Sequence, residues 1–222
     1  MDTVAVPASL LKLYLGQPLE LGEAVHVVEI DRESVAYLRS SDWMDPDRVH
    51  EGDLLKSSPE DLGMTGRFAV AGNFPYNISS QILFRVLDWR DRVPECVGMF
   101  QKEVADRVCA AHGSKTYGIL SVLLQTYYIC EYSFTVGPEA FIPPPKVQSG
   151  VIRLVRQKDK DPEGLDYETL RHLVKAAFGL RRKTLRNGLK SIPGVDESGF
   201  AALEQAGFHV TRLPPDGSTH AL

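Results

Sequence analysis

The stretch Arg67-Phe-Ala-Val-Ala-Gly-Asn-Phe-Pro-Tyr76 decides the fold class of this 222-residue chain. Residues 67–72 form a mostly apolar, β-rich run, as expected of a strand buried on both faces of a parallel sheet. Residues 73–76 form a turn, and apolar residues then recur with a helical period between positions 78 and 89. A strand, a turn and a helix in this order build open α/β sheets, which bind ligands where strands end.

The rest of the first two thirds repeats this alternation of short strands and helices. Strands are expected at 25–30, 48–51, 97–100, 126–136 and 147–155, and helices at 32–40, 102–111 and 118–125. The pattern predicts an α/β, Rossmann-like domain with a mostly parallel sheet over residues 1–156. A charged segment with helix breakers, 157–164, then acts as a linker to a small helical domain over residues 165–222.

Composition excludes several classes of protein. A hydrophobic content of 43% is sufficient for a buried core. The apolar runs are too short for a membrane span, and residues 1–7 lack the basic residues of a secretory signal. Three widely spaced cysteines form no CxxC pair, which predicts reduced thiols, no metal site and a cytoplasmic location.

Charge is unevenly distributed along the chain, although the net charge is only −4. Residues 1–70 hold 6 Lys and Arg against 13 Asp and Glu, whereas residues 141–190 hold 12 against 5. A polyanion would be attracted to the second region and repelled by much of the first. An ordinary solvated surface with chance asymmetry explains the same numbers.

The turn Asn73-Phe-Pro-Tyr76 matches the Asn-x-Pro-Tyr signature of amino-group methyltransferases. An adenine N6 is a poor nucleophile because its lone pair is delocalised into the ring. The side-chain oxygen of Asn73 and the carbonyl of Phe74 can accept hydrogen bonds from its two N–H groups and aim the lone pair at an activated methyl group. Pro75 would stiffen the turn and Tyr76 would stack on the base. A plain strand-to-helix turn is the alternative.

Two carboxylates stand where a nucleotide-type cofactor would need them. Glu29 lies at the end of the strand expected at 25–30, a position where acidic residues bind ribose hydroxyls in nucleotide-binding folds. Asp53 lies between that strand and the turn, where a carboxylate can accept a hydrogen bond from an adenine amino group. Either residue can instead be a solvated loop acid. The order Glu29, Asp53, Asn73 favours a cofactor site.

Five segments together resemble the small-subunit ribosomal RNA adenine N6,N6-dimethyltransferases, over about residues 25–190. They are Gly72–Ser80, Gln101–Arg107, Ser114–Gly118, Phe141–Ser149 and Arg181–Asn187. The last of them favours this family over the related large-subunit enzymes that confer macrolide resistance.

The resemblance implies a cytoplasmic, S-adenosylmethionine-dependent enzyme that acts on two adjacent adenosines in the terminal hairpin of small-subunit RNA. Its partner would be a 30S assembly intermediate and its state a monomer. Glu29 would hold the cofactor ribose and Asp53 its adenine, and Phe141 would face Tyr76 across the target base. Core packing is the alternative role for Phe141.

A set of basic side chains would meet RNA phosphates. These are Lys146, Arg181, Arg182, Lys183, Arg186 and Lys190. A solvated helix face whose charges complement the helix dipole is the alternative for the residues after 180.

The chain departs from the family at both ends. The stretch before Glu29 offers only Gly16 and Gly22, not a GxGxG turn, and predicts that a first strand is missing. That loss would expose an apolar sheet interior and weaken binding of S-adenosylmethionine. Residues 9–15 are expected to form a helix, and residues 211–222 carry breakers where the family continues into a helix.

Two other functions therefore stay open. The first is an RNA-binding or ribosome-assembly protein that has kept this fold without catalysis. The second is a DNA adenine methyltransferase, which the run Arg181–Asn187 and the lack of a recognisable DNA-reading domain disfavour.

Overall fold

The computed structural model describes residues 2–6, 25–179, 184–190, 192 and 195–205. The described chain divides into two compact units, one made of residues 1–105 with 127–157 and the other of residues 106–126 with 158–222. Each unit has its own packing. The first holds the whole β-sheet and the second is helical.

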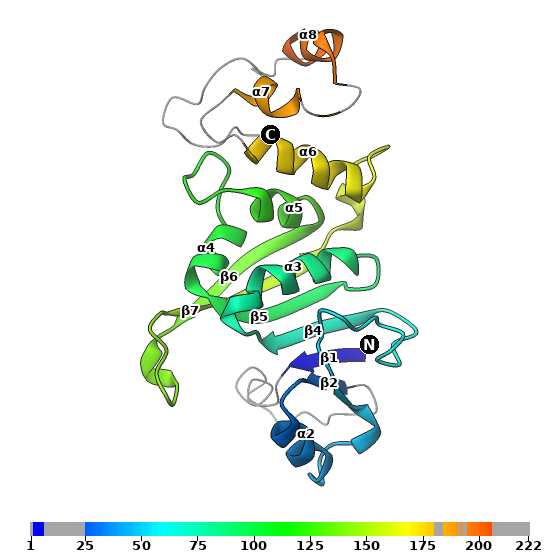
Figure 1. Ribbon diagram of the computed structural model, residues 1–222, viewed down its shortest axis with the longest axis vertical. Coiled ribbons are helices and arrows are strands. Elements are labelled where there is room, and N and C mark those ends of the chain that lie inside the picture. The colour runs from blue at the N-terminus through cyan, green and yellow to red at the C-terminus, as the bar shows by residue number, and fades with distance from the viewer. Residues whose placement is uncertain (1, 7–24, 180–183, 191, 193–194, 206–222) are drawn as a thin grey trace. The chain divides into compact units, whose positions relative to one another are not determined.

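Seven strands form one mixed sheet in the order β3-β2-β1-β4-β5-β7-β6 (Figure 1). They are β1 (Asp2–Val6), β2 (Val25–Glu29), β3 (Val49–Glu51), β4 (Phe68–Asn73), β5 (Glu95–Gln101), β6 (Tyr128–Val136) and β7 (Ser149–Arg156). Strands β1 to β5 pair in parallel, whereas β7 runs antiparallel to both β5 and β6. The expected strand over 67–72 is β4, which continues one residue further to include Asn73.

The expectation that a first strand is missing is wrong. Residues 2–6 form β1, which pairs with β2 from Thr3↔Val25 to Ala5↔Val27 and with β4 from Asp2↔Phe68 to Val6↔Gly72. Residues 7–24 join β1 to β2, and a parallel crossover needs only a dozen or more residues. The inner edge of β4 is therefore paired, and the sheet does not have the exposed interior that the sequence suggested. The glycines and the helix expected within 7–24 lie outside the described residues.

Helices follow the strands as the periodicity predicted. The sheet unit contains α2 (Arg32–Arg39), α3 (Ser79–Asp88) and the start of α4 (Lys102–Val108), with short 3-10 turns at η1 (Pro46–Arg48), η2 (Tyr76–Ile78) and η3 (Pro138–Ala140). Helix α3 shows how apolar periodicity marks a helix. Its buried residues are spaced so that they lie on one face: Ile82, Leu83, Val86 and Leu87.

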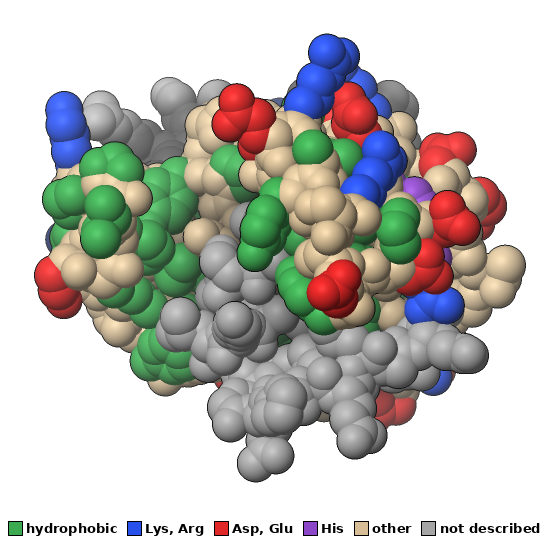
Figure 2. Space-filling view, turned by 90° about the horizontal axis from the view of Figure 1, so that it is seen from below, with side chains coloured by type: hydrophobic (Ala, Val, Ile, Leu, Met, Phe, Trp, Pro, Cys, Tyr) green, Lys and Arg blue, Asp and Glu red, His purple; other side chains and the backbone are tan. Residues whose placement is uncertain are grey.

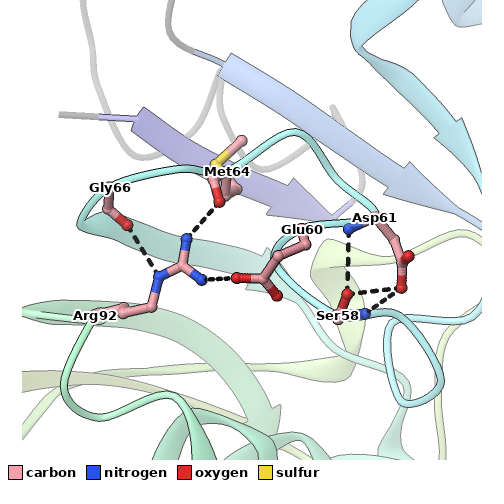
Figure 3. Close-up of polar contacts among 6 residues, drawn as sticks. All are labelled: Ser58, Glu60, Asp61, Met64, Gly66 and Arg92. Carbon is pink, nitrogen blue, oxygen red and sulfur yellow. Dashed lines mark hydrogen bonds and ion pairs between the residues drawn. The ribbon is translucent and has the colours of Figure 1, made fainter.

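Arg92 fixes the connection that leads into β4 (Figure 3). Its Nε donates to the carbonyl oxygen of Gly66 at 3.1 Å, and its two other guanidinium nitrogens contact the carboxylate of Glu60 and the carbonyl oxygen of Met64. The N–H of Phe68 donates to the carbonyl oxygen of Arg92 at 2.9 Å. The side chain and the backbone of Arg92 together thus tie this loop to the start of the central strand.

The helical unit contains α5 (Ile119–Tyr127), η4 (Lys158–Lys160), α6 (Tyr167–Gly179), α7 (Leu185–Leu189) and α8 (Glu197–Gln205). Leu185, Leu189 and Phe200 form its small apolar core. In the part of the chain that the structure describes, no helix combines the length and apolar character that crossing a membrane requires.

Candidate functional site

One edge of the sheet collects the residues that the sequence singled out. Strands β1 to β5 are parallel, so their carboxyl ends share this edge, and antiparallel β7 begins there with Ser149 opposite Gln101. The chain continues from β1 to β2 on one side, whereas β4 and β5 lie on the other. The ends of β1 and β4 therefore flank the point where the strand order reverses, which is where open α/β sheets bind ligands.

The turn after β4 is held from below by packing. Asn73 is the last residue of β4, opposite Met99 of β5, and the N–H of Phe74 donates to the carbonyl oxygen of Met99 at 3.1 Å. The Phe74 ring is 1% exposed and stacks on Phe100 with centroids 4.9 Å apart. It also lies over Gly98, where a β-carbon would be 2.5 Å from Phe74 Cε2. The ring thus anchors the backbone whose carbonyl was predicted to face the base.

The side chain of Asn73 has no hydrogen-bond partner among the described residues. Burial alternates along β4, and Asn73 falls on its less buried face. An amide in this state can accept a hydrogen bond from an incoming amine without first losing an internal one.

Tyr76 is hydrogen-bonded to the start of β7. It begins η2 and is half-buried, and its hydroxyl is hydrogen-bonded to the hydroxyl of Ser149. Pro75 has φ −56° and accepts hydrogen bonds on its carbonyl oxygen from the N–H of Ile78 at 3.2 Å and the hydroxyl of Ser79 at 3.3 Å. The turn is therefore fixed through its backbone and through its aromatic side chain.

The connection between β6 and β7 carries Phe141 and Lys146 to the same edge. Phe141 follows η3 and is half-buried, and its N–H donates to the carbonyl oxygen of Pro138 at 3.2 Å. Lys146 is exposed, and the side chain of Ile142 is fully exposed. Figure 2 shows hydrophobic side chains gathered on the lobe at the left of the view, the side on which this connection lies in Figure 1.

Glu29 ends β2 and is half-buried. Its Oε1 accepts hydrogen bonds from the N–H groups of Ile30 at 2.8 Å and Asp31 at 2.9 Å, which orients the carboxylate at the strand end. The N–H of Gly52 donates to the carbonyl oxygen of Glu29 at 2.9 Å, so the turn after β3 is joined to the end of β2. The structure therefore brings the neighbourhoods of Glu29 and Asp53 together, as the sequence order suggested.

Asp53 is also held by its own turn. Its Oδ1 accepts from the N–H of Leu55 at 3.0 Å, and its Oδ2 lies 3.8 Å from the ammonium group of exposed Lys56. Its side chain is only 27% exposed.

Ile30, which the sequence analysis did not single out, follows Glu29 and is 68% exposed.

The predicted basic residues after position 180 differ in whether the structure describes them and in their contacts. Arg181, Arg182 and Lys183 lie outside the described residues. Arg186, in α7, forms an ion pair with Glu197, and its guanidinium carbon lies 5.2 Å from the centre of the Phe200 ring. Arg186 therefore has contacts within its own unit, and its predicted role in RNA binding stays a prediction.

The model of the family described as ribosomal RNA adenine dimethylase matches residues 19–204. This chain belongs to that family. It is 52% identical over 172 residues to the ribosomal RNA small subunit methyltransferase A of Bacteroides fragilis, and 55% identical over 166 residues to that of Cytophaga hutchinsonii. The matches cover 78% and 75% of this chain, but the chain spans only 63% and 64% of the length of these two relatives.

Two solved structures share the fold of this family member. A dimethyladenosine transferase from Plasmodium falciparum superposes with a TM-score of 0.67 at 23% identity, over 92% of this chain and 70% of that one. The 23S rRNA methyltransferase ErmE superposes with a TM-score of 0.66 at 23% identity, over 99% and 86% of the two chains. The fold is therefore that of an α/β methyltransferase with a mixed sheet.

Proposed function

We propose that this chain transfers methyl groups from S-adenosylmethionine to the N6 atoms of two adjacent adenosines in the 3′-terminal hairpin of small-subunit ribosomal RNA. The observation that carries the proposal is the turn from Asn73 to Tyr76. It stands at the reversal point of the sheet, its backbone is fixed by a buried ring, and the Asn73 amide has no hydrogen-bond partner among the described residues. Membership of the adenine dimethylase family supports the substrate.

The residues at the ends of β2 and β3 suit the cofactor. Glu29 can accept hydrogen bonds from ribose hydroxyls, and Asp53 can accept one from an adenine amino group. Ile30 offers an exposed apolar surface on which a flat ring can lie. When bound, the cofactor supplies a methyl group already activated by its sulfonium charge.

The residues after β4 prepare the nucleophile. Asn73 Oδ1 and the Phe74 carbonyl accept the two N–H groups of the adenine amine, which favours a pyramidal nitrogen with a directed lone pair. Tyr76 and Phe141 stack on the faces of the base, which a hairpin loop can release at modest cost. Lys146 and the basic residues after position 180 bind the phosphates of a 30S assembly intermediate in the cytoplasm.

Methyl transfer from labelled S-adenosylmethionine to unmethylated small subunits tests the proposal. Asn73→Ala is expected to reduce the rate by roughly 100-fold or more, the usual effect of removing one such polar contact. Asn77→Ala is the matched control, because Asn77 is an exposed asparagine four residues further on and should change the rate little.

RNA binding without any transfer by the unmodified chain would favour the assembly-factor function instead. Isothermal titration with S-adenosylmethionine then shows whether transfer fails because the cofactor does not bind or because a chain that binds it does not catalyse. Weak cofactor binding was predicted partly from a missing first strand, and β1 removes that ground. Micromolar affinity would exclude a cofactor defect as the reason for inactivity.

A further inference from the structure

We infer that Ser149 is a positioning residue for the base-stacking ring of Tyr76, an inference that rests on the proposed methyl transfer. Ser149 is fully buried and its hydroxyl is hydrogen-bonded to that of Tyr76. Burying a hydroxyl costs free energy unless it is hydrogen-bonded. A polar side chain at this position is therefore explained by its partner on the turn, 73 residues away in the sequence.

The backbone at Ser149 is a rigid anchor. Ser149 is the first residue of β7 and pairs with Gln101 of β5 on one side and Val136 of β6 on the other. The next residue, Gly150, has no room for a side chain, because a β-carbon would be 2.6 Å from that of Ala105 and 2.9 Å from the hydroxyl of Tyr132. The position of the Ser149 hydroxyl is therefore set by three paired strands.

Tyr76, by contrast, lies on a short 3-10 turn and is only half-buried. A hydrogen bond from the rigid strand to the end of its side chain limits the rotation of the ring. The hydroxyl is occupied by Ser149, so the ring face is the part of Tyr76 left to contact a base. Pre-setting that ring lowers the cost of ordering it when the base arrives.

Among the described residues, two other serines are buried, and their hydrogen bonds have different partners. Ser79 donates to the carbonyl oxygen of Pro75 and so holds the backbone of the turn. Ser121 is as buried as Ser149, but its hydroxyl contacts the carbonyl oxygen of Arg107 and accepts from the N–H of Gly118, all within the helical unit. Ser121→Ala is therefore the matched control for removing a buried serine hydroxyl.

A double-mutant cycle on the full chain tests the inference. Ser149→Ala and Tyr76→Phe remove the same hydrogen bond from opposite ends, and both leave the aromatic ring in place. Each is expected to lower kcat/KM for small subunits by about tenfold, or about 1.4 kcal/mol, with the affinity for S-adenosylmethionine unchanged. The double variant should be no worse than either single variant, and Ser121→Ala should transfer normally per folded molecule.

A second measurement does not depend on catalysis. A hairpin RNA with 2-aminopurine at the target position has no N6 amine and reports only stacking, through quenching of its fluorescence. Ser149→Ala and Tyr76→Phe should both reduce this quenching, and Ser149→Thr, which keeps a hydroxyl, should restore part of it.

The two experiments separate the possible failures. If the unmodified chain transfers no methyl group but Ser149→Ala and Tyr76→Phe both reduce the quenching, the proposed function fails and the positioning role stands. The positioning role is overturned if Ser149→Ala leaves both transfer and quenching unchanged. It is also overturned if the double variant loses about 100-fold in kcat/KM, because the two substitutions would then act independently.

Discussion

At the scale of single residues, a missing side chain shapes the candidate site as much as those that are present. Gly98 lies in β5 beneath the Phe74 ring, and a β-carbon there would lie 2.5 Å from Phe74 Cε2 and 2.7 Å from Phe100 Cε2. Both rings are almost fully buried, so neither can move aside without disturbing the core. The position of the turn after β4 therefore depends on a glycine in the neighbouring strand.

Gly98→Ala is expected to lower the free energy of unfolding by about 1 to 3 kcal/mol, the usual cost of forcing extra volume into a packed core. Urea unfolding measures this change. Gly66→Ala is the control, because a β-carbon at Gly66 would meet nothing within 4 Å. Equal stability of the two variants would show that the Phe74 ring adapts at no cost.

At the scale of elements, Arg92 joins the segment after α3 to the connection before β4, a contact that the apolar periodicity of the sequence does not predict. It follows α3, and its guanidinium group binds the connection before β4 through Gly66, Met64 and Glu60 (Figure 3). Two of these three acceptors are backbone carbonyl oxygens. The geometry suits a planar group with several fixed N–H donors, which lysine lacks.

Arg92→Lys is therefore expected to destabilise the protein by about 1 to 3 kcal/mol and to speed hydrogen exchange in residues 58–66. Glu60→Gln should destabilise the protein less than Arg92→Lys, because the Glu60 side chain is 70% exposed and its ion pair is accessible to water. A larger effect from Glu60→Gln than from Arg92→Lys would mean that the ion pair, and not the carbonyl contacts, holds the loop.

At the scale of the whole molecule, the opposite charges of residues 1–70 and 141–190 predict salt-dependent RNA binding. Arg182→Ala and Lys183→Ala should each reduce the slope of log affinity against log salt by about one unit. Arg186→Ala should change the slope less, because Glu197 already neutralises that guanidinium group.

Arg32→Ala is the control for this measurement, since Arg32 is 88% exposed but lies in the acidic part of the sequence. Binding of a small-subunit hairpin at several salt concentrations gives the slopes. Unchanged slopes for Arg182→Ala and Lys183→Ala would remove both residues from the RNA-binding surface.

The sequence alone determined the order and type of most elements and the place of the candidate site. Apolar periodicity identified β2, β4, α3 and β5, because the pattern of burial along a strand or helix is a local property. The turn from Asn73 to Tyr76 was recognisable for the same reason, since its four residues are contiguous.

Only the tertiary structure decided which segments meet. The sequence did not reveal that residues 2–6 fill the gap between β2 and β4, because a five-residue strand is defined by its partners more than by its own pattern. The contacts of Tyr76 with Ser149 and of Phe74 with Gly98 join residues that are distant in the chain. Strand register creates such contacts, and register is a property of the folded sheet as a whole.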